Sequence, residues 1–124
     1  MTPGAIHIAT RPQYLADRSA PDEQHYVFAY TITIRNDGNE RVRLISRRWL
    51  ITDANGKKIE VEGSGVVGEQ PRIAPGEEYT YTSGVSLETP VGVMEGSYTM
   101  VLDDGREFQA PIAAFRLAMP NLIN

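Results

Sequence analysis

The stretch QHYVFAYTITIRNDG, residues 24–38, alternates large apolar side chains with smaller or polar ones. In an extended chain, successive side chains point to opposite faces, so this period of two predicts a half-buried strand. The stretch leads into the run Asn-Asp-Gly-Asn, residues 36–39, which favours a turn because Gly and Asn tolerate positive φ. The predicted buried face contains Tyr26, Phe28, Tyr30, Ile32 and Ile34.

Similar strand patterns follow along the chain. Asn55-Gly56 predicts a type I′ hairpin turn, Asp104-Gly105 predicts a second hairpin, and Pro12 predicts that the first strand lies at a sheet edge. No segment has a convincing helical period. These patterns predict an all-β fold, an antiparallel seven-stranded sandwich of the immunoglobulin or fibronectin type III kind. The further strands are expected within residues 5–15, 41–58, 57–63, 77–84 and 96–112.

Two aromatic residues make this prediction more specific. Trp49 is the only tryptophan and lies in the third predicted strand, where immunoglobulin-like sandwiches bury one. Tyr98 is expected at the start of the penultimate strand, in the place of a tyrosine corner. The chain has no cysteine, so the fibronectin type III sandwich is the nearer comparison.

Length and charge limit the function classes. The 124 residues fit one domain, 1–124, and the net charge of −4 disfavours nucleic acid or an anionic membrane as partner. No cysteine is available for disulfides, thiol catalysis or thiolate metal sites. The N-terminus lacks a signal-peptide pattern, and no apolar run approaches the ~20 residues of a membrane helix. We expect a cytoplasmic protein.

Four blocks in order resemble the ApaG family over nearly the whole chain. They are YVFAYTITIRNDG (26–38), LISRRWLITDANGK (44–57), VEGSGVVGEQPRIAPGEEYTYTSGVSLETPVGVMEGSYTMV (61–101) and IAAFRLAMP (112–120). The resemblance implies a fibronectin-III-like seven-stranded sandwich and no established biochemical activity. Bacterial members are genetically associated with a diadenosine tetraphosphatase, a ribosomal RNA methyltransferase, and cobalt resistance with magnesium efflux. Similar domains in an F-box ubiquitin-ligase subunit and a polymerase-interacting protein act as interaction modules.

Gly63, Gly65 and Gly68 have the G-x-G-x-x-G spacing of a nucleotide-binding loop. A dinucleotide site needs a helix directly after this loop, but Pro71 and the turn at Pro75-Gly76 follow instead. Three interpretations then stay open: an anion-binding nest of backbone N–H groups, a protein-contact surface, or bulges and tight turns of the fold. The acidic neighbours Glu60, Glu62 and Glu69 disfavour the nest, and we favour bulges and turns.

Five arginines lie within fourteen positions of an otherwise acidic chain. Guanidinium groups bind phosphate or carboxylate through paired hydrogen bonds, so an anion or partner site is one interpretation. We favour the other interpretation, a solvated strand face paired with Glu40, Glu60 or Glu62. Unless a bulge intervenes, one of two adjacent arginines must point to the face that Trp49 or Leu50 occupies. The five are Arg35, Arg41, Arg43, Arg47 and Arg48.

Catalytic chemistry is not expected. Only His7 and His25 could serve as histidine bases, and no G-x-S-x-G elbow is present. A metal set of these two histidines with Asp22 and Glu23 lacks a tight ligand spacing. We expect neither an enzyme nor a cofactor.

Our hypothesis is a non-catalytic module that binds a protein partner, with Val66, Val67 and Met94 as exposed apolar anchors. The alternative is a receptor for pyrophosphate-containing ligands, such as nucleotides or dinucleoside polyphosphates, at the glycine-rich loop. An edge strand also allows a homodimer. The candidate site residues are Gly63, Gly65, Val66, Val67, Gly68, Glu69, Gln70, Arg47 and Arg48.

Overall fold

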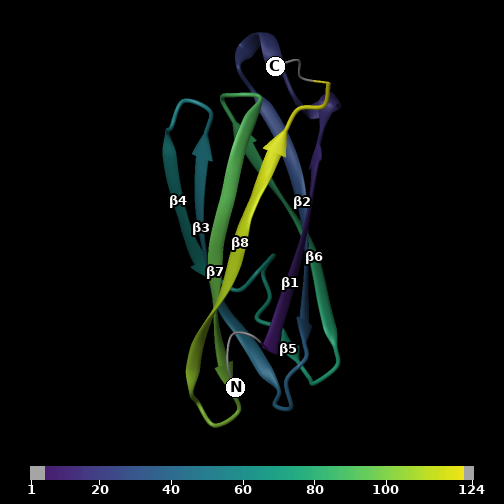
Figure 1. Ribbon diagram of the computed structural model, residues 1–124, viewed down its shortest axis with the longest axis vertical. Coiled ribbons are helices and arrows are strands. Elements are labelled where there is room, and N and C mark those ends of the chain that lie inside the picture. Colours follow the sequence, from purple (N-terminus) through teal and green to yellow (C-terminus); the bar gives the residue numbers. More distant parts are fainter. Residues whose placement is uncertain (1–4, 122–124) are drawn as a thin grey trace.

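The computed structural model describes residues 5–121. In this part of the chain, antiparallel strands form two packed sheets, which confirms the predicted β-sandwich (Figure 1). One sheet has the order β1-β2-β6, and the other has the order β4-β3-β7-β8 with β5 beside β3. The strands are β1 (Ile6–Tyr14), β2 (Tyr26–Asn36), β3 (Val42–Asp53), β4 (Lys58–Ser64), β5 (Arg72–Ile73), β6 (Glu78–Leu87), β7 (Val91–Leu102) and β8 (Glu107–Ala118).

The described residues contain one strand more than predicted. The short β5 pairs with Val42 and Arg43 at the start of β3. Its two residues lie between Pro71 and Pro75 and are too few to produce an alternating pattern. β5 nevertheless places Ile73 in the core, where the side chain is 1% exposed.

The core lies between the sheets, as the alternation of β2 predicts. Phe28, Ile32 and Ile34 are fully buried, and Trp49 is 2% exposed. The ring of Trp49 meets that of Tyr30 edge-on at a centroid distance of 5.4 Å, so the two sheets interlock through aromatic side chains. This confirms the expected buried tryptophan.

A β-bulge in β3 decides which arginine points inward. The register with β7 shifts between Leu44 and Ser46. Before the shift Leu44 faces the core, and after it Trp49 and Ile51 do, so the inward parity changes. Arg47, two residues before Trp49, therefore lies on the inner side of the sheet, and Arg48 lies on the outer side.

Two local predictions were wrong. Tyr98 lies inside β7 and bonds the hydroxyl of Tyr81, so it does not form a tyrosine corner. The hairpin at Asn55-Gly56 exists, but Gly56 has φ +82° and Asn55 has no positive φ, which excludes a type I′ turn. Asp53 Oδ1 accepts hydrogen bonds from the Asn55 and Lys57 amides. These bonds stabilise a turn that is longer than the two-residue type I′ turn.

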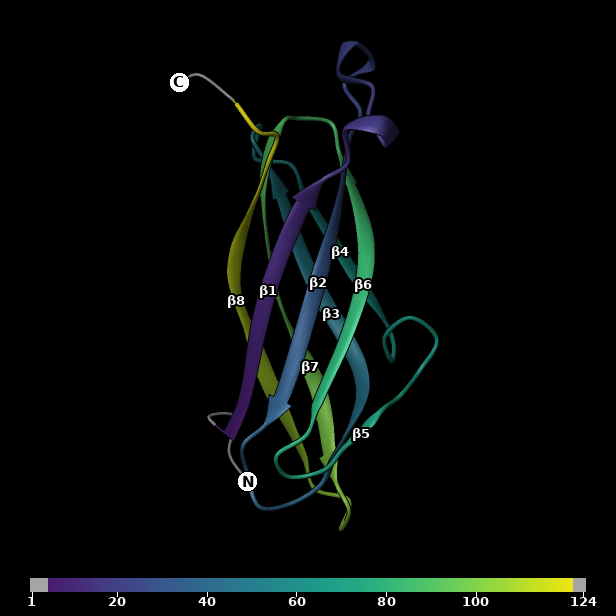
Figure 2. The ribbon, with the colours of Figure 1, turned by 90° about the vertical axis from the view of Figure 1, so that its right-hand side faces the viewer.

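The position of β1 and the β7–β8 turn confirm two further predictions. In residues 5–121, β1, which contains Pro12, is an edge strand that pairs only with β2, and Gly105 turns the β7–β8 hairpin with φ +92°. The β1–β2 connection holds two 3₁₀ turns, η2 (Ala16–Arg18) and η3 (Pro21–Glu23), at one end of the sandwich (Figure 2). None of the helical segments in residues 5–121 is long and apolar enough to cross a membrane.

Candidate functional site

The candidate site is the glycine loop, residues 63–70, together with Arg47 and the neighbouring part of β6. This loop leaves β4, projects beside β6, and returns to β5 (Figure 2). It lies at the side of the sandwich where β4 and β6 are the edge strands of the two sheets. We call this side the open side.

The tip of the glycine loop is a two-residue hairpin turn. Val66 and Glu69 exchange backbone hydrogen bonds of 2.8 and 3.0 Å. Between them, Val67 has φ +49° and Gly68 has φ +78°, as a type I′ turn requires. A β-branched residue in this left-handed region is a strained exception, and Val67 is also 63% exposed.

The structure gives two of the loop glycines a role in the fold. A Cβ atom at Gly63 would lie 2.8 Å from Arg47 Nη1, so this glycine makes room for the guanidinium group. Gly65 has φ +58°, and a Cβ there would lie 2.1 Å from the Glu69 carbonyl oxygen. Both observations agree with the bulge-and-turn interpretation of the spacing.

The loop amides are largely used within the fold. The Gly65 amide donates to the Ile45 carbonyl at 2.8 Å, and the Val66 and Glu69 amides bond across the hairpin. An anion-binding nest needs several neighbouring amides that point outward together. Three amides of this loop already have carbonyl partners, which weakens the interpretation as a nest.

Two of the predicted exposed anchors are buried. Val66 is 0% exposed, because the hairpin turns its side chain into the core and leaves only Val67 outside. Met94 is 1% exposed, since it pairs with Ile51 on the inner face of β7. The prediction that these two residues lie on the surface was wrong, whereas Val67 has the exposure expected of it.

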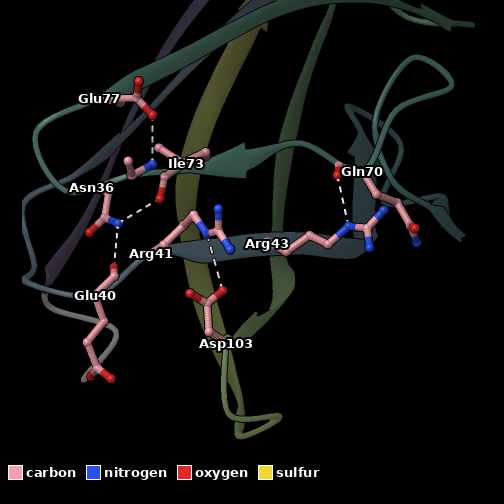
Figure 3. Close-up of polar contacts among 9 residues, drawn as sticks. Asn36, Glu40, Arg41, Arg43, Gln70, Ile73, Glu77 and Asp103 are labelled. Carbon is pink, nitrogen blue, oxygen red and sulfur yellow. Dashed lines mark hydrogen bonds and ion pairs between the residues drawn. The ribbon is translucent and has the colours of Figure 1, made fainter.

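Side-chain hydrogen bonds hold the return leg of the glycine loop. Gln70 Nε2 donates to the Ile45 carbonyl at 2.9 Å, and Arg43 Nε donates to the Gln70 carbonyl at 3.1 Å (Figure 3). The Tyr79 hydroxyl donates to Glu69 at 2.8 Å. Partial burial, together with this bond, raises the pKa of Tyr79. These bonds hold the return leg of the loop against β3 and β6.

Arg47 lies under the loop and is half-buried. Its Nη1 donates to the carbonyls of Ser64 and Gly65 at 3.1 and 2.9 Å. Within residues 5–121, no carboxylate lies within ion-pair distance of this guanidinium group. Arg47 also borders an open hollow of about 300 Å³, whose other walls include Val67, Tyr81, Thr82 and Ser83.

The other arginines of the cluster do not gather around this hollow. Arg48 is on the outer face of the sheet, 3.1 Å from Glu60 and 3.5 Å from Glu62, which confirms the expected cross-strand pairing. Arg41 pairs with Asp103 at 3.2 Å, away from the loop tip (Figure 3). The sequence cluster is therefore divided among several surfaces: in residues 5–121, Arg47 is the member that borders the hollow, and Arg43 contacts only the end of the loop at Gln70.

The polar network around β5 holds the far end of the loop. Asn36 is fully buried, and its Nδ2 donates to the carbonyls of Glu40 and Ile73 at 2.8 and 2.9 Å (Figure 3). The Glu77 carboxylate accepts a bond from the Ala74 amide. These bonds fix the short β5 against the β2–β3 turn and so determine where the glycine loop ends.

The two histidines lie apart from the glycine loop. His7 Nε2 is 3.1 Å from Asp37 Oδ2 at the start of β1, and His25 forms a β-bridge with Ala20 before β2. In residues 5–121, the structure brings together no three His, Cys, Asp or Glu side chains that could hold a metal ion.

Two residues that border the hollow with Arg47, Thr82 and Ser83 of β6, are absent from the predicted site, and Gly84 follows them in the strand. Their position next to Arg47 follows from the packing of two sheets. One signal was present in the sequence, because a glycine within an alternating strand often marks a close approach of another backbone.

The fold and this loop define a β-sandwich domain with a hydrogen-bonded loop projecting at its open side. A family model described as the ApaG domain matches residues 16–102. The chain is 57% identical to Protein ApaG of Shewanella pealeana, over 97% of this chain and 95% of that one. It is 54% identical to Protein ApaG of Photobacterium profundum, over 99% and 97% of the two chains. The chain belongs to the ApaG domain family.

A solved structure agrees with the fold. The crystal structure of a Bordetella pertussis protein is 48% identical and superposes with a TM-score of 0.91, covering 94% of this chain and 95% of that one. The β-sandwich is thus shared with a close relative.

Proposed function

We propose that this chain is a non-catalytic, single-domain binding module of the cytoplasm that holds a protein partner at the tip of the glycine loop. Val67 is the observation that carries this proposal. A strained backbone conformation persists only where the surrounding structure enforces it, and such positions cluster at functional sites. An apolar side chain with 63% exposure at that position has no packing role that explains the strain.

The surroundings of Val67 support the same conclusion. Val66 anchors the hairpin in the core, and hydrogen bonds hold Gln70 and Glu69 on its return leg. A loop that is already ordered loses little conformational entropy on binding. The tip is therefore a preorganised apolar contact point.

The test uses Val67→Asn, because asparagine tolerates a left-handed backbone better than valine does. We expect this variant to fold at least as stably as the parent chain and to lose its partner. Tagged full-length chain would recover bound proteins from cells of the source organism, and quantitative mass spectrometry would compare the variants. Val93→Asn is the matched control, since Val93 is also an exposed valine, at 36%, but lies in β7 away from the loop.

A specific protein that is recovered with the parent and with Val93→Asn, but not with Val67→Asn, supports the proposal. Equal recovery with all three chains contradicts it. The stability measurement ensures that a lost partner is not mistaken for a lost fold.

A second candidate function is a receptor for pyrophosphate-containing ligands, and Arg47 favours it. This guanidinium group has carbonyl partners and borders the hollow beside the loop. Three loop amides already bond within the fold, so Arg47 would supply most of the attraction. Amide-shift titration with inorganic pyrophosphate at low and moderate salt tests this. Saturable shifts at residues 63–68 that Arg47→Gln abolishes would favour the receptor over the partner module.

A further inference from the structure

We propose that the free edge of β6, from Thr82 to Ser86, binds an extended segment of the partner as an added strand, and that Arg47 binds a carboxylate on that segment. This inference rests on the proposed partner-binding function and names the chemistry of the partner. In strand addition, main-chain hydrogen bonds supply affinity and side-chain pockets supply specificity.

The free edge of β6 lacks the proline and the charged side chains that usually protect an edge strand against further pairing. In residues 5–121, β6 pairs only with β2, and its other edge is open. Natural edge strands are commonly protected by proline or by charged side chains, lysine in particular. β1 contains Pro12, β8 contains Pro111, and β4 carries Lys58 with two glutamates, whereas β6 carries one charged residue, Glu78 at its start.

The register shows which backbone groups face this edge. Val27 of β2 donates its amide to Ser19 Oγ, and its carbonyl accepts from the Leu15 amide, so both groups point to the β1 side. Backbone groups alternate in direction along antiparallel strands. Ser86, the partner of Val27, therefore turns its amide and carbonyl to the free edge, as do Gly84 and Thr82.

Gly84 is consistent with the approach of a partner backbone to this edge, because nothing within the described part of the fold requires a glycine there. A Cβ atom there would meet only the Phe28 carbonyl oxygen, at an ordinary distance of 3.6 Å, and the φ angle is not positive. Neither packing nor backbone conformation therefore requires glycine. Glycine weakens a strand interior, and it often marks close approach of a ligand or of another chain.

Arg47 defines the side chain that the segment must carry. It borders the same hollow as Thr82 and Ser83, and it has carbonyl partners but, among the described residues, no carboxylate. Arginine binds carboxylates through two parallel hydrogen bonds. The five residues from Thr82 to Ser86 span about 13–16 Å at roughly 3.3 Å per residue, so a short acidic strand fits.

A second copy of this chain fits the edge less well. In the antiparallel self-pairing centred on Ser83, one of the registers that this edge allows, Glu78 of one copy lies opposite Glu88 of the other. Like charges directly opposite each other destabilise a strand pair. The net charge of −4 adds to this repulsion. We therefore assign the edge to a different protein with an acidic extended segment.

The probe is a random 12-residue peptide library displayed on phage and selected against the full chain. The most enriched peptide is synthesised, and its dissociation constant is measured by calorimetry. Amide shifts and hydrogen exchange of the isotope-labelled chain then locate the bound peptide. We expect enriched peptides to be acidic, and we expect the Thr82, Gly84 and Ser86 amides to exchange fast without peptide and slowly with it.

Two variants and one control test the two parts of the site. Gly84→Pro removes an edge amide without removing a bond to β2, and we expect a loss of affinity of tenfold or more; Ser86→Pro replaces it if that chain does not fold. Arg47→Gln should also weaken binding by about tenfold, as loss of a charge-assisted pair does. Arg116→Gln on β8 makes the same charge change away from β6 and should have no effect.

Several results would overturn the inference: no enriched peptide, shifts that lie outside β6, or equal effects of Arg47→Gln and Arg116→Gln. A dimer in sedimentation that Gly84→Pro dissociates would assign the edge to a second copy instead. The experiment distinguishes failure of the strand addition from failure of the proposed partner-binding function. A cellular partner lost with Val67→Asn but kept with both Gly84→Pro and Arg47→Gln overturns only the strand addition.

Discussion

Tyr81 of β6 and Tyr98 of β7 join their hydroxyl groups in a buried hydrogen bond of 2.5 Å. The two strands belong to different sheets, so this bond is a polar link across the core. Tyr98 is fully buried, and Tyr81 is 7% exposed. Each hydroxyl therefore depends on the other, because an unpaired buried hydroxyl costs about 1–3 kcal/mol.

The two hydroxyl groups should be energetically coupled. The losses of unfolding free energy in the two single variants should add up to more than the loss in the double variant. We expect Tyr81→Phe and Tyr98→Phe each to lower the free energy of unfolding by about 1–3 kcal/mol. The double variant should lose less than the sum, since no hydroxyl is then left unpaired. Urea denaturation of the four chains measures this coupling, and strictly additive losses would contradict it.

Alkaline pH should destabilise the fold. Burial raises the pKa of Tyr81 to about 12 and raises that of Tyr98 as well, whereas an unfolded tyrosine ionises near pH 10. The stabilisation is therefore complete below about pH 10 and is lost as the pH rises through the folded pKa values. The loss due to Tyr81 alone is on the order of 2–3 kcal/mol. Denaturation curves between pH 8 and 12 measure it.

The Tyr81→Phe/Tyr98→Phe double variant is the control for this pH dependence. Without the two hydroxyls, its stability should fall less steeply above pH 10. An identical slope in both chains would assign the alkaline loss to other groups.

Gly65 and Gly84 should respond oppositely to alanine. Gly65→Ala places a Cβ 2.1 Å from the Glu69 carbonyl oxygen at φ +58°, so we expect a loss of more than about 2 kcal/mol. Gly84→Ala meets no close atom and should be neutral or stabilising by up to about 1 kcal/mol. Thermal unfolding distinguishes them, and a destabilised Gly84→Ala would show that packing does require this glycine.

Val66 and Val67 are adjacent and should behave differently. Val66 is fully buried, so Val66→Ala should cost about 2 kcal/mol of stability. Val67 is exposed in a left-handed conformation, so Val67→Asn should gain about 1 kcal/mol through relief of strain. Chemical denaturation measures both. A destabilised Val67→Asn would show that the valine side chain supports the loop.

The sequence by itself determined the sandwich and most of its core. The period of two in residues 26–34 assigns β2 its buried face, and the patterns around Trp49 and Tyr81 place these two side chains in the core from β3 and β6. Strand periodicity is local, and it depends only on the alternation of side chains along an extended backbone. The edge position of β1 follows equally from Pro12, because proline cannot donate to a strand ladder.

The tertiary structure alone decided the residues of the site. The bulge after Leu44 turned Arg47 inward, and the hairpin at the loop tip buried Val66 while it exposed Val67. Packing of the two sheets then set Arg47 beside Thr82 of β6, thirty-five positions further along the chain. Alternation cannot predict a bulge, a positive φ at valine or a contact between sheets, because each depends on atoms distant in sequence.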